Sequence, residues 1–437
     1  MVYGFIYQEN TRTMKNVLLI FYYFPPAGGS GVQRGLKFAK YLPEFGFRPV
    51  ILCADSRFLK QPRDYTLLRE LPNKVKIFRT FALDINWFYK LLWGLKLNKI
   101  VNFLRRNVFI PDGEILWLPF AIHKLKKIMA TNNINQVLVS VPPYSLIFLA
   151  KYLKKHYQTK VCLDFRDPWS FGIGRKYLKP PDWVTAIENR WEKEIVTRAD
   201  QVICVSSVMI EEFRHLYPYL DKNKFVCITN GYDEKDFPVS LPPIRNAKFT
   251  IIYTGSFYDE LQPDILWQAI LELIQEGCLN PRKIAVEIYG RNFRNFVLGK
   301  YITDPILNQI VHFHGYINHR NSIQILRAAD VLLLYLGSGE AQRAIVTAKV
   351  FEYLRSGKPI LAIIDSSGAA ADILKPANTA FIADSSSIHS IKETLGNLYR
   401  LWEKDKLQTE PKWDYIQQFE RKALTAKLAE VFSALEQ

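Results

Sequence analysis

Apolar runs of strand length alternate along the chain with segments of helix length, and this alternation indicates the class of fold. There are nine such runs: NVLLIFYY, RPVILCA, QVLVSV, KVCLDF, QVICVSS, FTIIYTG, IAVEIYG, VLLLYL and PILAII. Because nearly all of their positions are apolar, the runs are typical of parallel strands that are covered by helices on both faces of a sheet. The sequence therefore predicts an α/β protein with doubly wound sheets.

The series of runs divides near residues 240–248, SLPPIRNAK, a polar stretch with two prolines that predicts a linker. A chain of 437 residues exceeds what one hydrophobic core usually supports, so two domains are expected. We place the first domain at residues 14–238 and the second at residues 247–405. The final segment, residues 406–437, has helical spacing, and we expect it to pack back toward the first domain.

The ends and the cysteines give a consistent picture of the cellular compartment. The first 13 residues lack the basic start and apolar run of a signal peptide, and Met14 directly precedes the first strand, so we expect Met14 to be the true start. No stretch approaches the roughly 18 apolar residues of a membrane span. The five cysteines are scattered, odd in number and free of CxxC spacing, which fits buried reduced thiols in a cytoplasmic protein.

The net charge of +16 indicates an acidic partner: nucleic acid, an anionic membrane surface or a phosphorylated small molecule. The charge is concentrated in the first half of the chain. Residues 74–107 carry eight Lys or Arg, one acid and seven aromatic residues, and residues 121–160 carry seven Lys and no acid. No nucleic-acid-binding module accompanies these residues, so we do not expect a nucleic-acid partner.

One basic segment, residues 97–106, has the pattern of an amphipathic helix. Its apolar residues recur at i, i+3, i+4 and i+7: Leu97, Ile100, Val101 and Leu104. The opposite face carries Lys99, Asn102 and Arg106. Two interpretations stay open, because such a stripe either lies in an anionic membrane interface or packs on the core of its own domain. The preceding stretch, residues 85–93, shows no single clean stripe.

Two motifs of the first half follow strands. After the first strand, PPAGGSG supplies Gly29 in a tight turn, and the helix that opens next directs its free amides toward an anion. A turn that merely joins strand to helix is the alternative. In LDFRDPW, the strand ends in Asp164, Arg166 and Asp167, at the edge where doubly wound sheets hold their active sites. We predict these three as catalytic residues, although one carboxylate could instead form a clamp with an arginine.

Strands of the second half repeatedly end in glycine, as close approach of the backbone to a ligand requires. The candidates for ligand binding are Gly255 and Ser256 in YTGSF, Gly290 and Arg291 in IYGRN, and His314, Gly315 and Tyr316 in FHGYI. Each turn could also be an ordinary strand-to-helix connection, and His314 a structural imidazole. The chain offers no DxD-like cluster or His/Cys set that would bind a divalent ion.

A final segment, VTAKVFEYLRSGKPILA, reads as a helix and a buried strand, with Lys349 and Glu352 three residues apart. Taken alone, the two charges are most simply a solvated pair on a helix surface.

In order, the glycine loop, the ADQVICVSS strand, the NGYD turn, the YTGS strand, the FHGYI turn and FEYLRSGKPIL resemble the nucleotide-sugar glycosyltransferases of family 4. The likeness spans about residues 15–405. It implies the GT-B fold, in which two Rossmann-like domains face each other across a cleft, the first for the acceptor and the second for the nucleotide sugar. It also implies a retaining, metal-independent enzyme without a cofactor, of the bacterial surface-polysaccharide type.

The resemblance assigns Glu352 to the ribose hydroxyls of the donor, and the helix start at residues 347–350 to the diphosphate. A carboxylate accepts two hydrogen bonds from a vicinal diol, and the amides near Thr347 and Val350 with the Lys349 ammonium attract phosphate. Three departures stand out. Ala344 occupies the place of a second family glutamate, with Glu340 the nearest carboxylate. An arginine and a lysine common after the strand end are missing, which leaves Arg343 and Arg291 as candidate diphosphate ligands. Leu163 stands where the family often has histidine.

The predicted reaction transfers a sugar to a hydroxyl of a glycan or lipid-linked glycan, with Asp164 or Asp167 orienting acceptor or sugar. Helix amides and cations would stabilise the departing nucleoside diphosphate. We expect a cytoplasmic enzyme, peripheral on the inner face of the membrane. Two alternatives remain: a nucleotide-sugar epimerase on the same fold, which needs no acceptor, and a non-catalytic basic module that binds a membrane.

Overall fold

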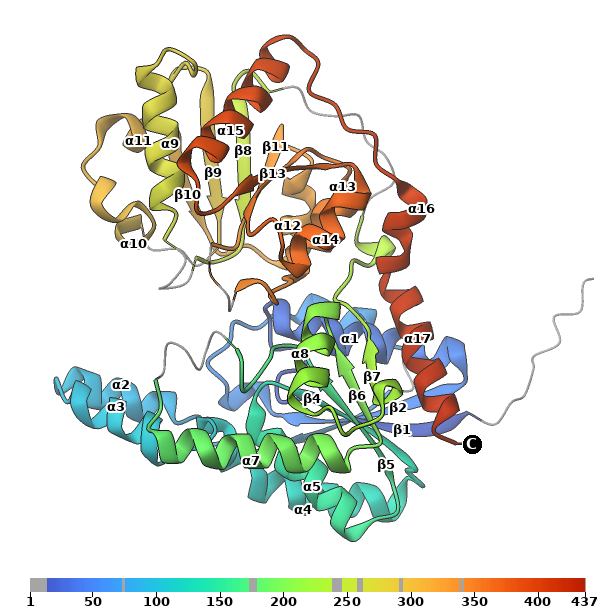
Figure 1. Cartoon of the computed structure of the whole chain (residues 1–437). Helices are drawn as coiled ribbons and strands as arrows, with labels where there is room; N and C mark the ends of the chain where they lie inside the picture. The colour runs from blue at the N-terminus through green and yellow to red at the C-terminus, as the bar shows by residue number, and fades with distance from the viewer. Residues whose placement is uncertain are drawn as a thin grey trace, which may run out of the picture.

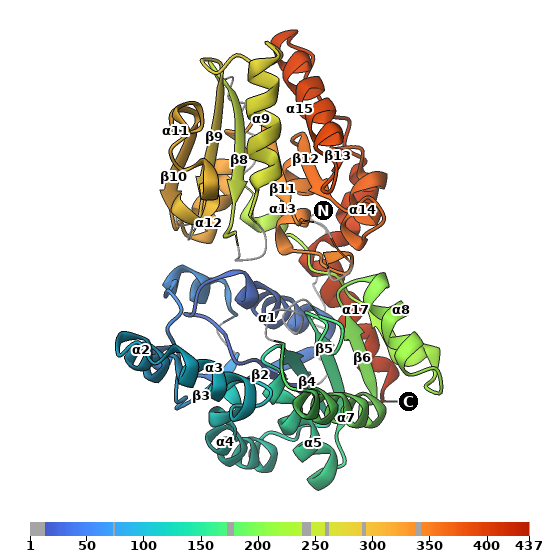
Figure 2. The same cartoon turned by 60° about the vertical axis from the view of Figure 1, so that its left-hand side comes forward.

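The computed structural model describes residues 14–72, 75–172, 179–237, 246–257, 262–290, 294–337, 339 and 342–436. Two parallel sheets, each covered by helices, form two bodies stacked across a central gap between ribbons (Figures 1 and 2). The first sheet lies within residues 15–227 and the second within residues 249–384. The two doubly wound domains predicted from the apolar runs are therefore present.

The first sheet has the order β3-β2-β1-β4-β5-β6-β7, with every pair parallel. Its strands are β1 (Lys15–Ile20), β2 (Phe47–Ala54), β3 (Lys76–Thr80), β4 (Gln136–Val141), β5 (Lys160–Phe165), β6 (Gln201–Cys204) and β7 (Phe225–Cys227). Its helices are α1 (Ser30–Tyr41), α2 (Asn86–Gly94), α3 (Asn98–Asn107), α4 (Leu118–Thr131), α5 (Ile147–His156), α7 (Asp182–Arg198) and α8 (Ser207–Leu216).

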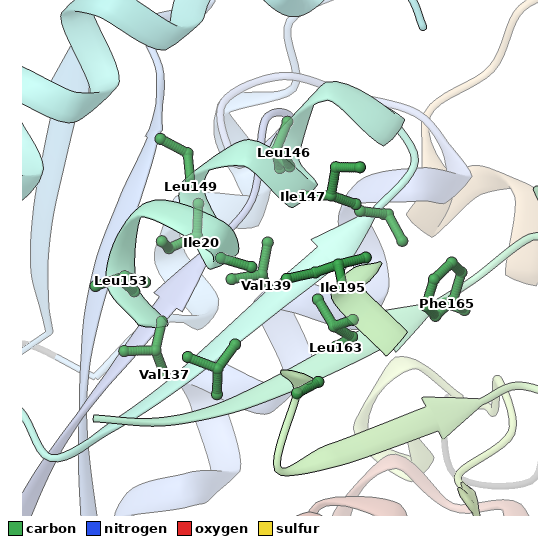
Figure 3. Packing of buried hydrophobic residues seen from close by; sticks show 14 of the residues in the cluster. Ile20, Val137, Val139, Leu146, Ile147, Leu149, Leu153, Leu163, Phe165 and Ile195 are labelled. Atoms are coloured by element: carbon green, nitrogen blue, oxygen red, sulfur yellow. The ribbon is translucent and has the colours of Figure 1, made fainter. Parts of the chain in front are cut away.

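Burial of the central strands on both faces explains their continuous apolar runs. All six residues of β4 are buried, because helices cover both sides of the sheet. Figure 3 shows one of these sides, where Val137, Val139 and Leu163 of the strands pack under Leu149 and Leu153 of α5. Close packing of this kind fixes the strand ends, and hence the side chains that follow them.

The second sheet has the order β10-β9-β8-β11-β12-β13 and is also parallel. Its strands are β8 (Phe249–Thr254), β9 (Ile284–Tyr289), β10 (Val311–Gly315), β11 (Val331–Tyr335), β12 (Ile360–Ile364) and β13 (Ala380–Asp384). Its helices are α9 (Asp264–Gln275), α10 (Arg294–Leu298), α11 (Pro305–Ile310), α12 (His319–Leu326), α13 (Ala348–Ser356), α14 (Ala369–Leu374) and α15 (Ile388–Glu403). In each sheet the strand order reverses beside the first strand, where doubly wound folds bind ligands.

The end of the chain returns to the first domain, as predicted. After α16 (Trp413–Ile416), helix α17 (Arg421–Ala434) runs down the side of the first domain (Figure 1). Its Leu424, Leu428 and Phe432 are buried in one cluster with Val17 and Phe38 of the first domain. The last helix thus completes a core that begins with the first strand.

Other predictions from the sequence meet the structure as follows. All five cysteines are free; Cys53, Cys162 and Cys204 are buried, whereas Cys278 is exposed. Within the described ranges, no helix combines the length and the apolar character needed to cross a membrane. Most of the predicted linker, residues 240–245, lies outside the described residues, and the exact domain boundaries stay a prediction.

Candidate functional site

The glycine loop of the first domain faces the second domain. Gly29 has a φ of 106°, a left-handed value that favours glycine, and directly precedes α1. A side chain on Gly28 would meet the Tyr316 hydroxyl at 3.2 Å and the Pro62 carbonyl oxygen at 3.1 Å. The structure therefore brings two predicted elements, the glycine loop and Tyr316, together across the cleft.

Arg166 joins the glycine loop to the end of β4. Its Nη1 donates to the Gly31 carbonyl at 2.9 Å, and its Nη2 donates to the Pro142 carbonyl. Its Nε is buried without a hydrogen-bond partner in the described part of the chain. Burial lowers the pKa of this guanidinium, and Asp167 and Asp164 oppose the shift. The neighbouring Asp167 is exposed at the same sheet edge.

Asp164 points away from the cleft into a buried ion pair. Arg34 of α1 donates to its carboxylate through Nε at 3.0 Å and through Nη2 at 2.7 Å, and the Ser140 hydroxyl donates at 2.7 Å. Arg34 also donates to the carbonyls of Ile228 and Thr229. The carboxylate-arginine clamp that the sequence left open is thus formed by Asp164, with Arg34 as its partner instead of Arg166. No surface of Asp164 is exposed for contact with a substrate.

Lys349 lies at the start of α13 and turns toward the end of β8. Its Nζ donates to the Tyr253 hydroxyl at 2.8 Å and sits 4.1 Å from the centroid of that ring. A Cβ on Gly255, whose φ is 128°, would come within 2.8 Å of the same Nζ. No carboxylate in the described ranges forms an ion pair with Lys349. Burial lowers the pKa of Lys349 to about 7, against the opposing charge of Glu352.

Four other residues predicted to bind the sugar donor are described: Thr347 and Val350 at the start of α13, Ser256 after β8, and Arg343 in the segment before α13. Thr347 is the N-cap, and its Oγ1 is buried with no hydrogen-bond partner within the part of the chain that is described. Val350 is fully buried and offers only its backbone. The Ser256 carbonyl accepts from the Tyr253 hydroxyl at 3.2 Å. Arg343 is half-exposed, with Nε 3.9 Å from Asp365.

Glu352 lies one turn further, at the junction of the two domains. His319 of α12 contacts its Oε1 through Nε2 at 3.0 Å. A small cavity beside them is also lined by Gln33 and Lys37 of α1 and by Arg421 of α17. Burial lowers the pKa of His319, but the carboxylates of Glu352 and Asp236 outweigh it, so the net shift is upward. Sequence reasoning missed His319, because nothing in NHRNS distinguishes it from a helix-surface residue.

Three of the remaining predicted residues, His314, Gly290 and Gly315, lie at the ends of β9 and β10. His314 contacts Glu287 through Nε2 at 2.5 Å and stacks on the Tyr289 ring, which matches the structural role considered for it. The Gly290 amide donates to the Gly315 carbonyl at 2.7 Å, which ties the ends of β9 and β10 together. Arg291, a predicted diphosphate ligand, and Glu340, the carboxylate nearest to the missing family glutamate, lie outside the described residues.

Comparison with known protein families shows to which class of enzyme the chain belongs. Residues 30–236 match the model of Glycosyltransferase Family 4, and residues 240–410 match the model of Glycosyl transferases group 1. The chain belongs to the GT-B glycosyltransferases. No curated protein is similar enough in sequence to serve as a relative.

Solved structures with the same architecture span the whole glycosyltransferase. A sucrose-phosphate synthase from Thermosynechococcus elongatus is 14% identical, with a TM-score of 0.66 over 96% of this chain and 99% of the other. A glycosyltransferase from Rickettsia africae is 15% identical, with a TM-score of 0.57 over 97% and 99%. WaaG, a glycosyltransferase involved in lipopolysaccharide biosynthesis, is 12% identical, with a TM-score of 0.56 over 95% and 99%. At these identities the likeness concerns the fold.

One cluster of acids in the glycosyltransferase has the spacing of a metal site. Glu70, Asp233 and Asp236 place carboxylate oxygens within 4.8 Å of one another. Lys37 contacts all three at 2.6 to 2.8 Å, and Lys40 contacts Glu70 and Asp233. Because two ammonium groups already contact the three acids, the cluster is better explained as an ion-pair network that holds α1 to Glu70 and to the turn after β7.

Proposed function

We propose that the glycosyltransferase moves a sugar from a nucleoside diphosphate sugar to a hydroxyl of a glycan, free or lipid-linked, with retention and without a metal ion. The observation that carries this proposal is the environment of Lys349. Within the described ranges, the partly buried Lys349 has no carboxylate at ion-pair distance; it lies at the N-terminus of a helix, beside a Thr347 hydroxyl for which the same ranges offer no hydrogen-bond partner, and this arrangement suits an anion. A diphosphate supplies the missing charge and hydrogen-bond acceptors.

Departure of the diphosphate is the step that these groups would assist. Lys349, the free amides of α13 and the Thr347 hydroxyl would stabilise the negative charge that develops on the leaving group. At the opposing sheet edge, Arg166 and the exposed Asp167 would orient the acceptor or the sugar. The acceptor hydroxyl would then attack from the face that the diphosphate leaves. Asp164, which is enclosed by Arg34 and Ser140, would act by holding this edge in place.

The experiment that tests the reaction separates transfer from its alternatives. A screen of nucleoside diphosphates by thermal shift selects the donor base, and the matching nucleotide sugars are then incubated with and without glycan acceptors. Transfer that requires an acceptor supports the proposal. Formation of an epimer without an acceptor would instead support an epimerase, and binding without any turnover would support a non-catalytic module.

Glu352→Gln is expected to weaken the binding of the nucleoside diphosphate by roughly 1.5 to 3 kcal/mol, the range for hydrogen bonds to a charged group. Only one oxygen of Glu352 is engaged by His319, so the other is available to the ribose hydroxyls. Isothermal titration calorimetry measures the change, and the 2′,3′-dideoxynucleotide is the control, because it should bind parent and variant equally. Unchanged affinity of Glu352→Gln for the ribonucleotide would reject the assignment.

We also propose that the protein binds an anionic membrane surface. This proposal rests on the hairpin of α2 and α3, which projects from the side of the first domain (Figures 1 and 2). The apolar stripe predicted for α3 is only partly buried. Val101 and Leu104 pack against α2, within their own domain, whereas Leu97 and Ile100 are exposed. Large apolar side chains are exposed all along residues 81–108: Phe81, Leu83, Phe88, Leu91, Trp93, Leu95, Leu97, Ile100, Phe103 and Val108. Lys90, Lys96 and Lys99 lie among them. Apolar and cationic groups on one projection fit an anionic lipid surface.

We expect the protein to float with anionic phosphatidylglycerol vesicles at low salt and less with neutral vesicles, since each Lys or Arg near an anionic leaflet contributes about 1 kcal/mol. Leu95→Glu combined with Phe103→Glu should abolish this flotation. Tyr219→Glu is the matched control, because Tyr219 is 56% exposed, close to the 61% and 60% of Leu95 and Phe103, but lies beside Thr197 near the far end of α7. Equal flotation of all variants would contradict the proposal.

A further inference from the structure

A second pocket lies in the first domain, between the end of α3, the start of α7 and the loops that follow β4 and β5. The enclosed part measures about 90 Å³, and the space reaches about 560 Å³ when the adjoining open solvent is counted, so a ligand would lie partly in solvent. Its lining includes Arg105, Arg106, Pro111, Tyr144, Trp169 and Glu188. None of these residues belongs to the Lys349 site, so the ligand of this pocket has to be inferred separately from that of the Lys349 site.

One wall of the pocket is formed by the partly exposed Tyr144, with the buried Trp169 beside it. The rings of Tyr144 and Trp169 stack with centroids 4.9 Å apart and planes 5° from parallel. The Tyr144 hydroxyl donates to the Pro168 carbonyl at 2.8 Å, which holds the stack in place. The C–H face of a pyranose ring is flat and apolar, and it packs favourably on aromatic surfaces.

The mouth of the pocket is cationic. Arg105 and Arg106 are exposed at the end of α3, and Arg106 donates to the Lys179 carbonyl. Across the described ranges, no hydrogen bond or ion pair engages Arg105. Guanidinium groups recognise phosphate with two parallel hydrogen bonds, which distinguishes an arginine pair from diffuse surface charge. The buried Glu188 also lines the pocket.

We infer that this pocket binds a sugar phosphate that forms part of the acceptor, with the sugar ring against the partly exposed Tyr144, which Trp169 supports, and the phosphate at Arg105 and Arg106. The inference rests on the proposed transfer reaction, which needs an acceptor. The pocket is connected to the cleft, because Pro142, two residues before Tyr144, is bound by Arg166, which also binds the glycine loop at Gly31. The two arginines lie in the last turn of α3, so a lipid attached to the phosphate would lie next to the apolar hairpin.

The test uses glucose 1-phosphate as the probe, with methyl α-glucoside and inorganic phosphate as its two halves. Titrations are made on the full chain carrying Lys349→Ala, so that phosphate binding at the donor site does not contribute. The sugar phosphate should bind at least about tenfold more tightly than either half, and Arg105→Ala with Arg106→Ala should remove about tenfold or more of that affinity. Lys99→Ala, on the same helix but outside the pocket, should leave it unchanged.

Two results would overturn the inference. In the first, methyl α-glucoside binds as tightly as glucose 1-phosphate; in the second, the double arginine variant binds glucose 1-phosphate as tightly as the protein with both arginines. If that variant loses only its flotation with anionic vesicles, the arginines serve the membrane and the inference also fails. A decyl phosphodiester of glucose that binds more tightly than glucose 1-phosphate would assign a lipid-linked source, and equal binding a soluble one. Binding of a nucleoside diphosphate to the protein with Lys349 intact is measured in parallel. If that binding is absent, the proposed donor site is wrong, and this result is distinct from a failure of the pocket to bind the sugar phosphate.

Discussion

Lys349→Ala is expected to weaken the binding of a nucleoside diphosphate by about 10 to 100 fold and to leave the binding of the bare nucleoside unchanged. The reason is that Nζ lies beside Gly255, near the start of α13, where a diphosphate would sit, whereas the ribose would be held by Glu352. Calorimetric titration with both ligands measures the two affinities. Equal losses for nucleoside and diphosphate would show that the substitution damages the helix instead.

The lowered pKa of Lys349 gives this prediction a second, independent readout. With a pKa of about 7 in the free protein, most of the lysine is neutral at pH 8, and a bound diphosphate restores its charge. Binding at pH 8 should therefore take up close to one proton, about 0.9, and affinity should fall by up to about tenfold for each pH unit above 7. Titrations in buffers of different ionisation enthalpy count the protons. Lys349→Arg is the control, because arginine stays charged and should take up none.

Arg34→Met is expected to lower the free energy of unfolding by about 3 to 5 kcal/mol, the usual result of removing one partner of a buried ion pair. The substitution leaves the Asp164 carboxylate enclosed with only the Ser140 hydroxyl, and it also removes the donors to the carbonyls of Ile228 and Thr229. Urea denaturation curves of parent and variant measure the loss.

Two controls separate this effect from ordinary loss of charge. Arg34→Met combined with Asp164→Leu should recover part of the stability, because no unpaired charge then stays buried. Lys151→Met removes an ion pair with Glu194 whose side chains are 40% and 26% exposed, and it should cost no more than about 1 kcal/mol. If Arg34→Met is no more destabilising than Lys151→Met, Asp164 is not held as described.

The predictability of the fold depended on burial. All nine apolar runs are strands, because strands in the middle of a covered sheet are apolar on both faces. The four other strands, β3, β7, β10 and β13, occupy the edges of the two sheets. β3 illustrates the reason: its sequence KIFRT has one buried residue and four that are partly or fully exposed, so it lacks the continuous run. The pattern of apolar residues therefore predicts a strand well when other strands lie on both sides of it, and poorly when the strand lies at the edge of the sheet.

The site was predictable only where local sequence sets geometry. The position of Lys349 follows from a helix start that faces a glycine, and both are visible in the sequence. The partner of Asp164 is not visible, because Arg34 lies 130 residues away and reaches it only through the packing of α1 on the sheet. His319 at Glu352 and the pocket at Arg105 likewise arise from elements that meet only in the folded chain.

The return of α17 to the first domain affects how the protein is made. A ribosome synthesises the chain from its N-terminus, so the first strand waits for the whole second domain before Leu424, Leu428 and Phe432 are available to cover it. During that interval, Val17 and Phe38 are left without these neighbours. The first domain therefore cannot finish folding while it is being translated, and the nascent chain exposes an apolar surface that chaperones are suited to protect.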